Sequence, residues 1–298
     1  MPPSLLALRS MAEPPVVWWI GPPPPLAVTR LTRMLQLGAL CAMVTWVFGF
    51  LGGLRLSPQP TAPDGSANDT SQLFNWHPLL ITVAFPVLMA EAILAYKAPL
   101  VSMQDRPHAK LYHLVLHTLA LACTVLGVVA AFKSHTLKKP TPMADLYSSH
   151  SYLGLATLSL LGFQYLLAAY SYLFPKLTLA RRRALGPLHS YLGKGILVAG
   201  LATMAVGIQE KQTFVQAYGK PASLYEPRMW LPGLIQLLLL ATGLFVLYHH
   251  APPAAPPAHH RRQQYAGDAD GTEDASLVTA QMSETDELHF ERDARHSA

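Results

Sequence analysis

Four histidines stand at the start of long apolar stretches of the sequence. They are His77 in FNWHPLL, His113 in KLYHLVLH, His150 in SSHSYLG and His189 in PLHSYLG. The segment HSYLG occurs twice, so Gly154 and Gly193 each lie one helical turn after a histidine. An imidazole can bind a metal, exchange a proton near neutral pH or hydrogen-bond at a helix end. Which of these applies depends on the elements that position the four rings.

The apolar stretches predict membrane-spanning helices. Of the 298 residues, 51% are hydrophobic and only 13% are charged. Six runs are long enough for an α-helix to cross about 30 Å of hydrocarbon, and short polar segments join them. We therefore expect an all-α membrane protein with six transmembrane helices in an antiparallel bundle. The expected spans are residues 31–54, 77–98, 110–132, 150–173, 187–208 and 229–249.

Both ends of the chain differ from these spans in composition. Residues 1–29 are rich in proline, and their apolar stretch VVWWI is too short for the core of a signal peptide. Residues 251–298 have neither the periodicity nor the apolar content of a folded segment. We expect a disordered leader over 1–29, a transmembrane domain over 30–250 and a disordered tail over 251–298. The net charge of +5 belongs to no soluble basic domain, so nucleic-acid binding is not expected.

Two features orient the predicted bundle. Lys and Arg are more frequent on the side of the N-terminus, which indicates that both termini are cytoplasmic. Asn68 begins the glycosylation acceptor Asn-Asp-Thr in the first loop, which this orientation places in a lumen or outside the cell. Because successive helices alternate in direction, His77 and His150 fall near the lumenal face. His113 and His189 fall near the cytoplasmic face.

Paired histidines inside a membrane indicate function, because an ionisable side chain is costly there and needs a partner. A zinc site usually takes four ligands, and neither a cysteine nor a carboxylate accompanies these pairs. Haem iron needs only two axial ligands from the protein. Gly154 and Gly193 share a helix face with their histidines and lack Cβ. They would leave room either for a flat macrocycle or for close helix packing.

Two other classes of protein are compatible with these histidines. A transporter of protons or divalent metals would need a carboxylate inside the membrane, and Glu91 is the candidate in the second span. A non-catalytic membrane scaffold would use the histidines only to form hydrogen bonds at helix ends. Such a scaffold would bind no chromophore.

The sequence also resembles a known family. The motifs FNWHPLL, KLYHLVLHTLAL, VVAAFKSH, ADLYSSHSYLGL and GPLHSYLGKG occur in the order and spacing of the cytochrome b561 proteins, over about residues 31 to 249. Ser149 and Tyr152 depart from the Leu and Trp that the family commonly has there. These proteins are ascorbate-dependent transmembrane ferrireductases and monodehydroascorbate reductases. The form FNWHP is most similar to the lysosomal branch.

The resemblance implies an oxidoreductase with two haem b groups per chain, held among helices two to five. Electrons would pass from cytoplasmic ascorbate through both haems to ferric iron or monodehydroascorbate on the lumenal or extracellular side. His77 and His150 would be the axial ligands of the lumenal haem iron, and His113 and His189 those of the cytoplasmic one. His117, one turn deeper than His113, would make a hydrogen bond within the bundle instead.

The resemblance also implies two substrate sites. By this resemblance, the family's cytoplasmic binding positions for the ascorbate anion correspond to Arg106, Lys110 and Arg182. Basic residues at this face also serve topology and lipid headgroups. The lumenal site matches Phe132, His135 and Tyr147. His135 lies roughly 33 Å along its helix from His113, at 1.5 Å per residue, so it belongs beside the lumenal haem.

The predicted orientation and the family resemblance together give the expected location. We expect a multi-pass membrane protein with both termini in the cytoplasm. The resemblance favours the membrane of the late endosome or lysosome, with the plasma membrane or a secretory vesicle as alternatives. A homodimer is left open.

Overall fold

The computed structural model describes residues 24–100 and 106–251, without the side chain of Arg106. Within these ranges six helical segments are long and apolar enough to cross a membrane. The predicted architecture, an all-α membrane protein with six transmembrane helices, is confirmed. The segments are α2 (Leu26–Phe50), Ser71–Leu94, α6 (Arg106–Thr136), α7 (Ser149–Ala168) continued by η2 (Ala169–Leu173), α8 (Leu179–Gly219) and α9 (Pro227–Tyr248).

The second segment is not one regular helix. It consists of α3 (Ser71–Phe74), α4 (Trp76–Thr82), the π-helix η1 (Val83–Met89) and α5 (Ala90–Leu94). Pro86 lies in η1, and proline breaks α-helical hydrogen bonding because it has no N–H. The neighbouring Phe85 packs on Gly200 of α8, where an added Cβ would lie 2.1 Å from the phenyl Cε1. The irregular helix and α8 therefore approach each other closely in the middle of the bundle.

Several helix boundaries differ from the expected ones, those of α2 and α8 among them. Helix α2 begins at Leu26, inside the predicted leader, and ends at Phe50 because Gly52 and Gly53 follow with φ of +82° and +78°. Residues 1–23 of that leader and the predicted tail from residue 252 lie outside the described ranges. Helix α8 has 41 residues, from Leu179 to Gly219, where the sequence predicts 187–208. Hydropathy marks only the part of a helix that suits lipid, so it misses the polar turns at both ends of α8.

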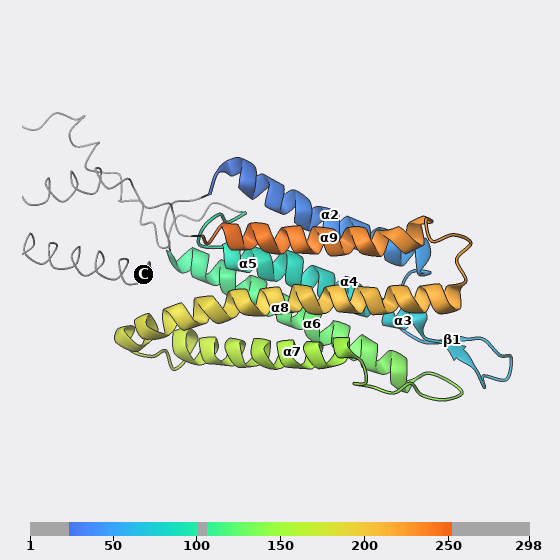
Figure 1. Ribbon diagram of the computed structural model, residues 1–298. Helices are drawn as coiled ribbons and strands as arrows, with labels where there is room; N and C mark the ends of the chain where they lie inside the picture. Colours follow the sequence, from blue (N-terminus) through green and yellow to red (C-terminus); the bar gives the residue numbers. More distant parts are fainter. Residues whose placement is uncertain (1–23, 101–105, 252–298) are drawn as a thin grey trace, which may run out of the picture. The chain divides into compact units, whose positions relative to one another are not determined.

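Successive membrane-spanning helices run antiparallel (Figure 1). Helix α2 packs on α9, α9 on α8, α8 on α7, and α4 on α6. Trp46 of α2, Leu197 of α8 and Ile235 of α9 are completely or almost completely buried between these helices. Apolar residues such as Leu166 stay exposed because lipid, not water, would surround them.

The two ends of the bundle can be told apart by what they carry. At one end, here called the hairpin end, strands β1 (Gln59–Pro60) and β2 (Asn68–Asp69) pair antiparallel. These strands are not among the elements that the sequence predicts. At the other end, here called the termini end, α2 begins and α9 stops (Figure 1).

Asn68 joins two loops at the hairpin end. Its amide Nδ2 donates to the carbonyl of Leu137 at 2.8 Å, and its Oδ1 accepts from the backbone N–H of Lys139 at 2.9 Å. The first loop is thereby held against the loop that follows α6. Glycosylation of Asn68 stays a prediction.

Candidate cofactor and substrate sites

The first histidine pair lies toward the hairpin end. The ring centroids of His77 from α4 and His150 from α7 are 5.9 Å apart, with the ring planes at 77°. His77 Nδ1 donates to the carbonyl of Gly127 at 3.1 Å, and His150 Nδ1 donates to the carbonyl of Thr203 at 3.0 Å. Because a carbonyl can only accept, both Nδ1 atoms carry the proton and both Nε2 atoms keep a free lone pair.

Two glycines that the sequence analysis did not single out make room for this pair. A Cβ on Gly207 would lie 2.5 Å from Cε1 of His150, and a Cβ on Gly127 would lie 3.4 Å from the carbonyl oxygen of His77. Only glycine allows His150 to lie against α8 in this way. A general excess of glycine in membrane helices hides such positions in the sequence.

The predicted glycines have more space around them. A Cβ on Gly154 would come no closer than 3.8 Å to Cγ2 of Thr203, and one on Gly193 no closer than 3.8 Å to Nε2 of Gln164. These are ordinary van der Waals distances, so close helix packing does not require either glycine. Their expected role beside a bound macrocycle remains a prediction.

The second pair lies toward the termini end. The ring centroids of His113 from α6 and His189 from α8 are 6.2 Å apart, with the ring planes at 66°. His113 Nδ1 donates to the carbonyl of Ala92 at 2.7 Å. The side-chain amide of Gln164 lies 2.7 Å from both Nδ1 and the carbonyl oxygen of His189. Gln164 therefore fixes this ring, a role that the sequence alone did not reveal.

His117 differs from the expectation. Its ring lies edge-on to His113 with centroids 4.5 Å apart. The expected hydrogen bond is not found between His117 and any other described residue. His117 lies one turn beyond His113 on α6, and its ring contacts that of His113.

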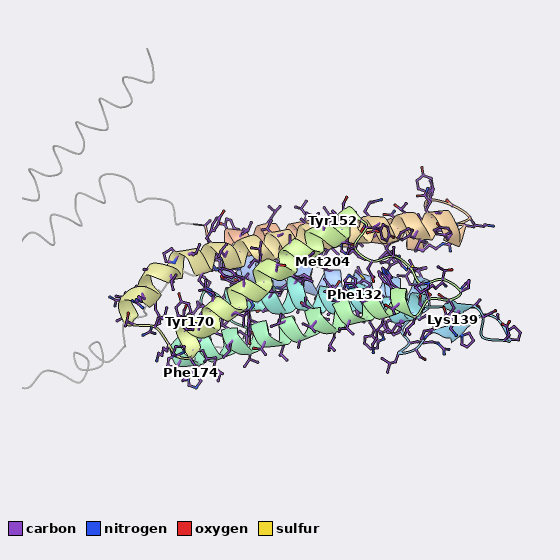
Figure 2. The ribbon with its side chains drawn as sticks, turned by 90° about the horizontal axis from the view of Figure 1, so that it is seen from below. Phe132, Lys139, Tyr152, Tyr170, Phe174 and Met204 are labelled. Atoms are coloured by element: carbon purple, nitrogen blue, oxygen red, sulfur yellow. The ribbon has the colours of Figure 1, made fainter. Side chains whose placement is uncertain are left out.

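A cavity of about 850 Å³ adjoins the first pair. The residues predicted for the lumenal side line it together, although they come from three separate parts of the sequence. They are His77, Phe132, His135, Tyr147, His150 and Gly154. Figure 2 shows Phe132 and Lys139 toward this hairpin end, and Tyr170 and Phe174 toward the other.

His135 is firmly positioned in this cavity. Its Nδ1 lies 2.7 Å from a carboxylate oxygen of Asp145, and its ring is parallel to that of Phe74, with centroids 6.5 Å apart. Lys211 adds a cation 4.8 Å above the Phe74 ring. Burial raises the pKa of Tyr147, and the nearby Glu210 raises it further. The cavity thus contains both cationic and anionic groups, including Asp145 and Lys211, which the sequence analysis missed.

The predicted ascorbate residues gather at the termini end. Lys110 Nζ donates to the carbonyl of Tyr172 at 2.6 Å, and the Tyr172 hydroxyl donates to the carbonyl of Arg182 at 3.2 Å. The Tyr172 ring lies 5.5 Å from the His189 ring, centroid to centroid. Tyr172 thus joins Lys110 and Arg182 to the second histidine pair. The backbone of Arg106 begins α6, and its side chain is outside the described part.

Residues 76–215 match the family described as eukaryotic cytochrome b561. The chain is 33% identical over 195 residues to transmembrane ascorbate ferrireductase 1 of Arabidopsis thaliana, an alignment that covers 65% of this chain and 75% of the relative. It is 35% identical over 216 residues to the lysosomal membrane ascorbate-dependent ferrireductase of Mus musculus. That alignment covers 72% of this chain and 84% of the relative. The chain belongs to the cytochrome b561 family. This confirms the predicted class of the protein, a transmembrane oxidoreductase.

The part of the chain that matches the cytochrome b561 family includes both histidine pairs. Haem is the cofactor of this family, and the geometry of the pairs fits it. Two metal–nitrogen bonds of about 2 Å, one on each side of a metal, suit rings at these separations. Among the described residues no cluster of three or more His, Cys, Asp or Glu could hold a metal ion. A group bound at either pair would bring its remaining ligands itself, as a porphyrin does.

Proposed function

We propose that this protein carries electrons across a membrane, from ascorbate at the termini end to an acceptor at the hairpin end. One haem b would be held by His77 and His150 and a second by His113 and His189. The observation that carries the proposal is the pairing of four histidines at two depths, with three Nδ1 atoms hydrogen-bonded to backbone carbonyls. Such bonds fix the tautomer and orientation of a metal-binding imidazole.

The haem groups, when bound, supply the one-electron redox chemistry. The chain supplies axial ligation, orientation and a dry environment between its helices. The carbonyls of Gly127, Thr203 and Ala92 keep Nε2 of their histidines available to iron. The amide nitrogen of Gln164, 2.7 Å from Nδ1 of His189, holds that ring in place.

At the termini end we propose that Arg106, Lys110 and Arg182 bind ascorbate, which is an anion at neutral pH. Nε of Arg182 is buried and has no hydrogen-bond partner within the described residues. An arginine donor without a partner suits an incoming anion. Tyr172 contacts both Lys110 and the His189 ring. A donor bound there would be close to the second haem.

At the hairpin end we propose that Phe132, His135 and Tyr147 form the acceptor site. His135 can hand a proton to or take one from a bound substrate, and Asp145 holds its ring in place. Ferric iron is the proposed acceptor, because relatives of this chain carry the name ferrireductase. Monodehydroascorbate is the alternative acceptor.

The proposed orientation places the termini end in the cytoplasm and the hairpin end, with a glycosylated Asn68, in a lumen. The lysosomal membrane is the proposed location, since a mouse relative is named as a lysosomal membrane enzyme. Digestion with an N-glycosidase, combined with imaging of the tagged protein, tests both statements.

The deciding experiment is a reduced-minus-oxidised absorption spectrum of the purified protein, with ascorbate as the only reductant. A sharp b-type band with about two haems per chain is expected. His113→Ala and His189→Ala should each lose the haem of the second pair and keep the haem of the first. His77→Ala should lose the haem of the first pair and keep the haem of the second. His108→Ala, at an exposed histidine outside both pairs, is the matched control. Unchanged haem content in folded pair variants would refute the assignment.

A further inference from the structure

A cleft of about 360 Å³ lies between α8 and α9 at the termini end. Its wall includes Tyr191, Lys194 and Val198 of α8, and Leu247 and His250 at the end of α9. None of the paired histidines and none of the proposed substrate residues line this cleft. It is therefore separate from the redox sites.

Three cationic or titratable groups gather around the cleft from three parts of the chain. Lys194 and His250 line it, and Lys97, just after α5, lies close to both. Lys97 is only 8% exposed, and no hydrogen bond or ion pair joins its ammonium to another described residue. Burial lowers the pKa of Lys97, and the nearby Lys194 lowers it further. A buried ammonium without a partner favours an anion beside it.

The described part of the chain supplies no carboxylate for these groups. The one described carboxylate at the termini end is Glu91, and both of its oxygens accept from Arg33 at 3.2 Å. The remaining described carboxylates belong to the hairpin end or its loops. The positive charge of Lys97 and Lys194 is thus left without a counterion from the described residues.

The depth of the cleft suits a lipid headgroup. Helix α9 stops at Tyr248, beside the cleft, whereas α8 continues beyond it to Leu179. Tyr191 and Tyr248 are 72% and 56% exposed there, and exposed tyrosines are typical of the membrane–water interface. Val198 and Leu247 extend the wall of the cleft from this level into the apolar zone.

We propose that the cleft binds one anionic phospholipid from the leaflet at the termini end. The phosphate and acidic headgroup lie against Lys194, with Lys97 behind them. One acyl chain follows Val198 and Leu247. Basic pockets between transmembrane helices recognise acidic headgroups in this way, and the apolar wall is what a soluble anion would not need.

The test compares phosphatidylserine with phosphatidylcholine as ligands of the purified, haem-loaded protein in detergent, by native mass spectrometry. The wild type is expected to retain phosphatidylserine in preference to phosphatidylcholine. Lys194→Gln and Lys97→Gln should each weaken phosphatidylserine binding about fivefold, the usual effect of one basic residue at a membrane surface. Arg30→Gln removes an exposed cation at the same end, outside the cleft, and should leave binding unchanged.

Two further comparisons distinguish a lipid site from a site for soluble anions and from general surface charge. Glycerophosphoserine, which has the headgroup but no acyl chains, should not compete at equal concentration. Competition by it would show a site for soluble anions and overturn the lipid assignment. An equal loss in Arg30→Gln would show general surface charge, which also overturns it. Should a lysine variant fail to fold, the wild-type comparison still decides, because equal retention of both lipids contradicts the proposal.

Discussion

His150 Nδ1 donates to the carbonyl of Thr203, and Thr203 lies 14 residues along α8 from His189. At 1.5 Å per residue the two points are about 21 Å apart along the helix. Helix α6 repeats the relationship, since Gly127, which accepts from His77, lies 14 residues from His113. Each of these helices therefore carries a histidine of one pair and positions a histidine of the other. The two sites cannot move independently along the bundle.

Gly154→Ala tests whether position 154 must lack a side chain because a haem lies against α7 there. Without one, the new methyl group meets only Thr203 at 3.8 Å, and alanine should stabilise α7 by about 1 kcal/mol. With a haem against the helix, we expect haem affinity at the first pair to fall by about 1–3 kcal/mol through overpacking. Haem content and melting temperature are measured together. Gly162→Ala in the same helix, where nothing lies within 4 Å, should gain stability and keep both haems.

The sequence predicts the pairing of the histidines because helix direction alternates and each histidine begins a span. It does not predict what holds the rings. The partners of His77 and His150 are backbone carbonyls, which every residue has, so nothing in the side chains at 127 and 203 marks them. Gln164 and Tyr172 acquire their roles only when α7 and η2 pack beside α8. Likewise, Pro86 signals an irregular helix, but nothing in the side chains specifies the π-helical form of Val83–Met89.

Asp145→Asn tests the positioning of His135. The Asp145 side chain is 37% exposed, so its contact with His135 is worth at most about 1 kcal/mol. We expect the transfer of electrons from the ascorbate-reduced protein to a ferric chelate to slow by up to about fivefold, with an altered pH profile and full haem content. Stopped-flow absorbance measures the rate. Asp64→Asn, an exposed carboxylate in the loop beside β1, should have no effect, and an unchanged profile in Asp145→Asn would remove its assigned role.

Glu91→Gln separates electron transfer from proton or metal transport. Glu91 accepts from Arg33 through both carboxylate oxygens, so it is occupied by a structural ion pair. Removing its charge should cost about 1–3 kcal/mol of stability while ascorbate still reduces both haems. Arg33→Gln with Glu91→Gln should cost less than the sum of the two single variants. A folded Glu91→Gln protein that no longer accepts electrons from ascorbate would contradict this assignment.

His249 makes stability depend on pH at the termini end. Burial lowers the pKa of His249 below its ordinary value of 6.5; Arg33 and Lys97 lower it further, while the Phe245 carbonyl and Glu91 oppose the shift. A lowered pKa means that the fold favours neutral imidazole, so this stabilisation is complete above pH 6.5 and is lost as the pH falls below it. The melting temperature of the wild type should therefore drop between pH 7.5 and 5.5. His249→Gln should drop less over the same range, whereas His108→Gln, at an exposed histidine, should follow the wild type. Equal slopes in all three proteins would show that His249 does not control this transition.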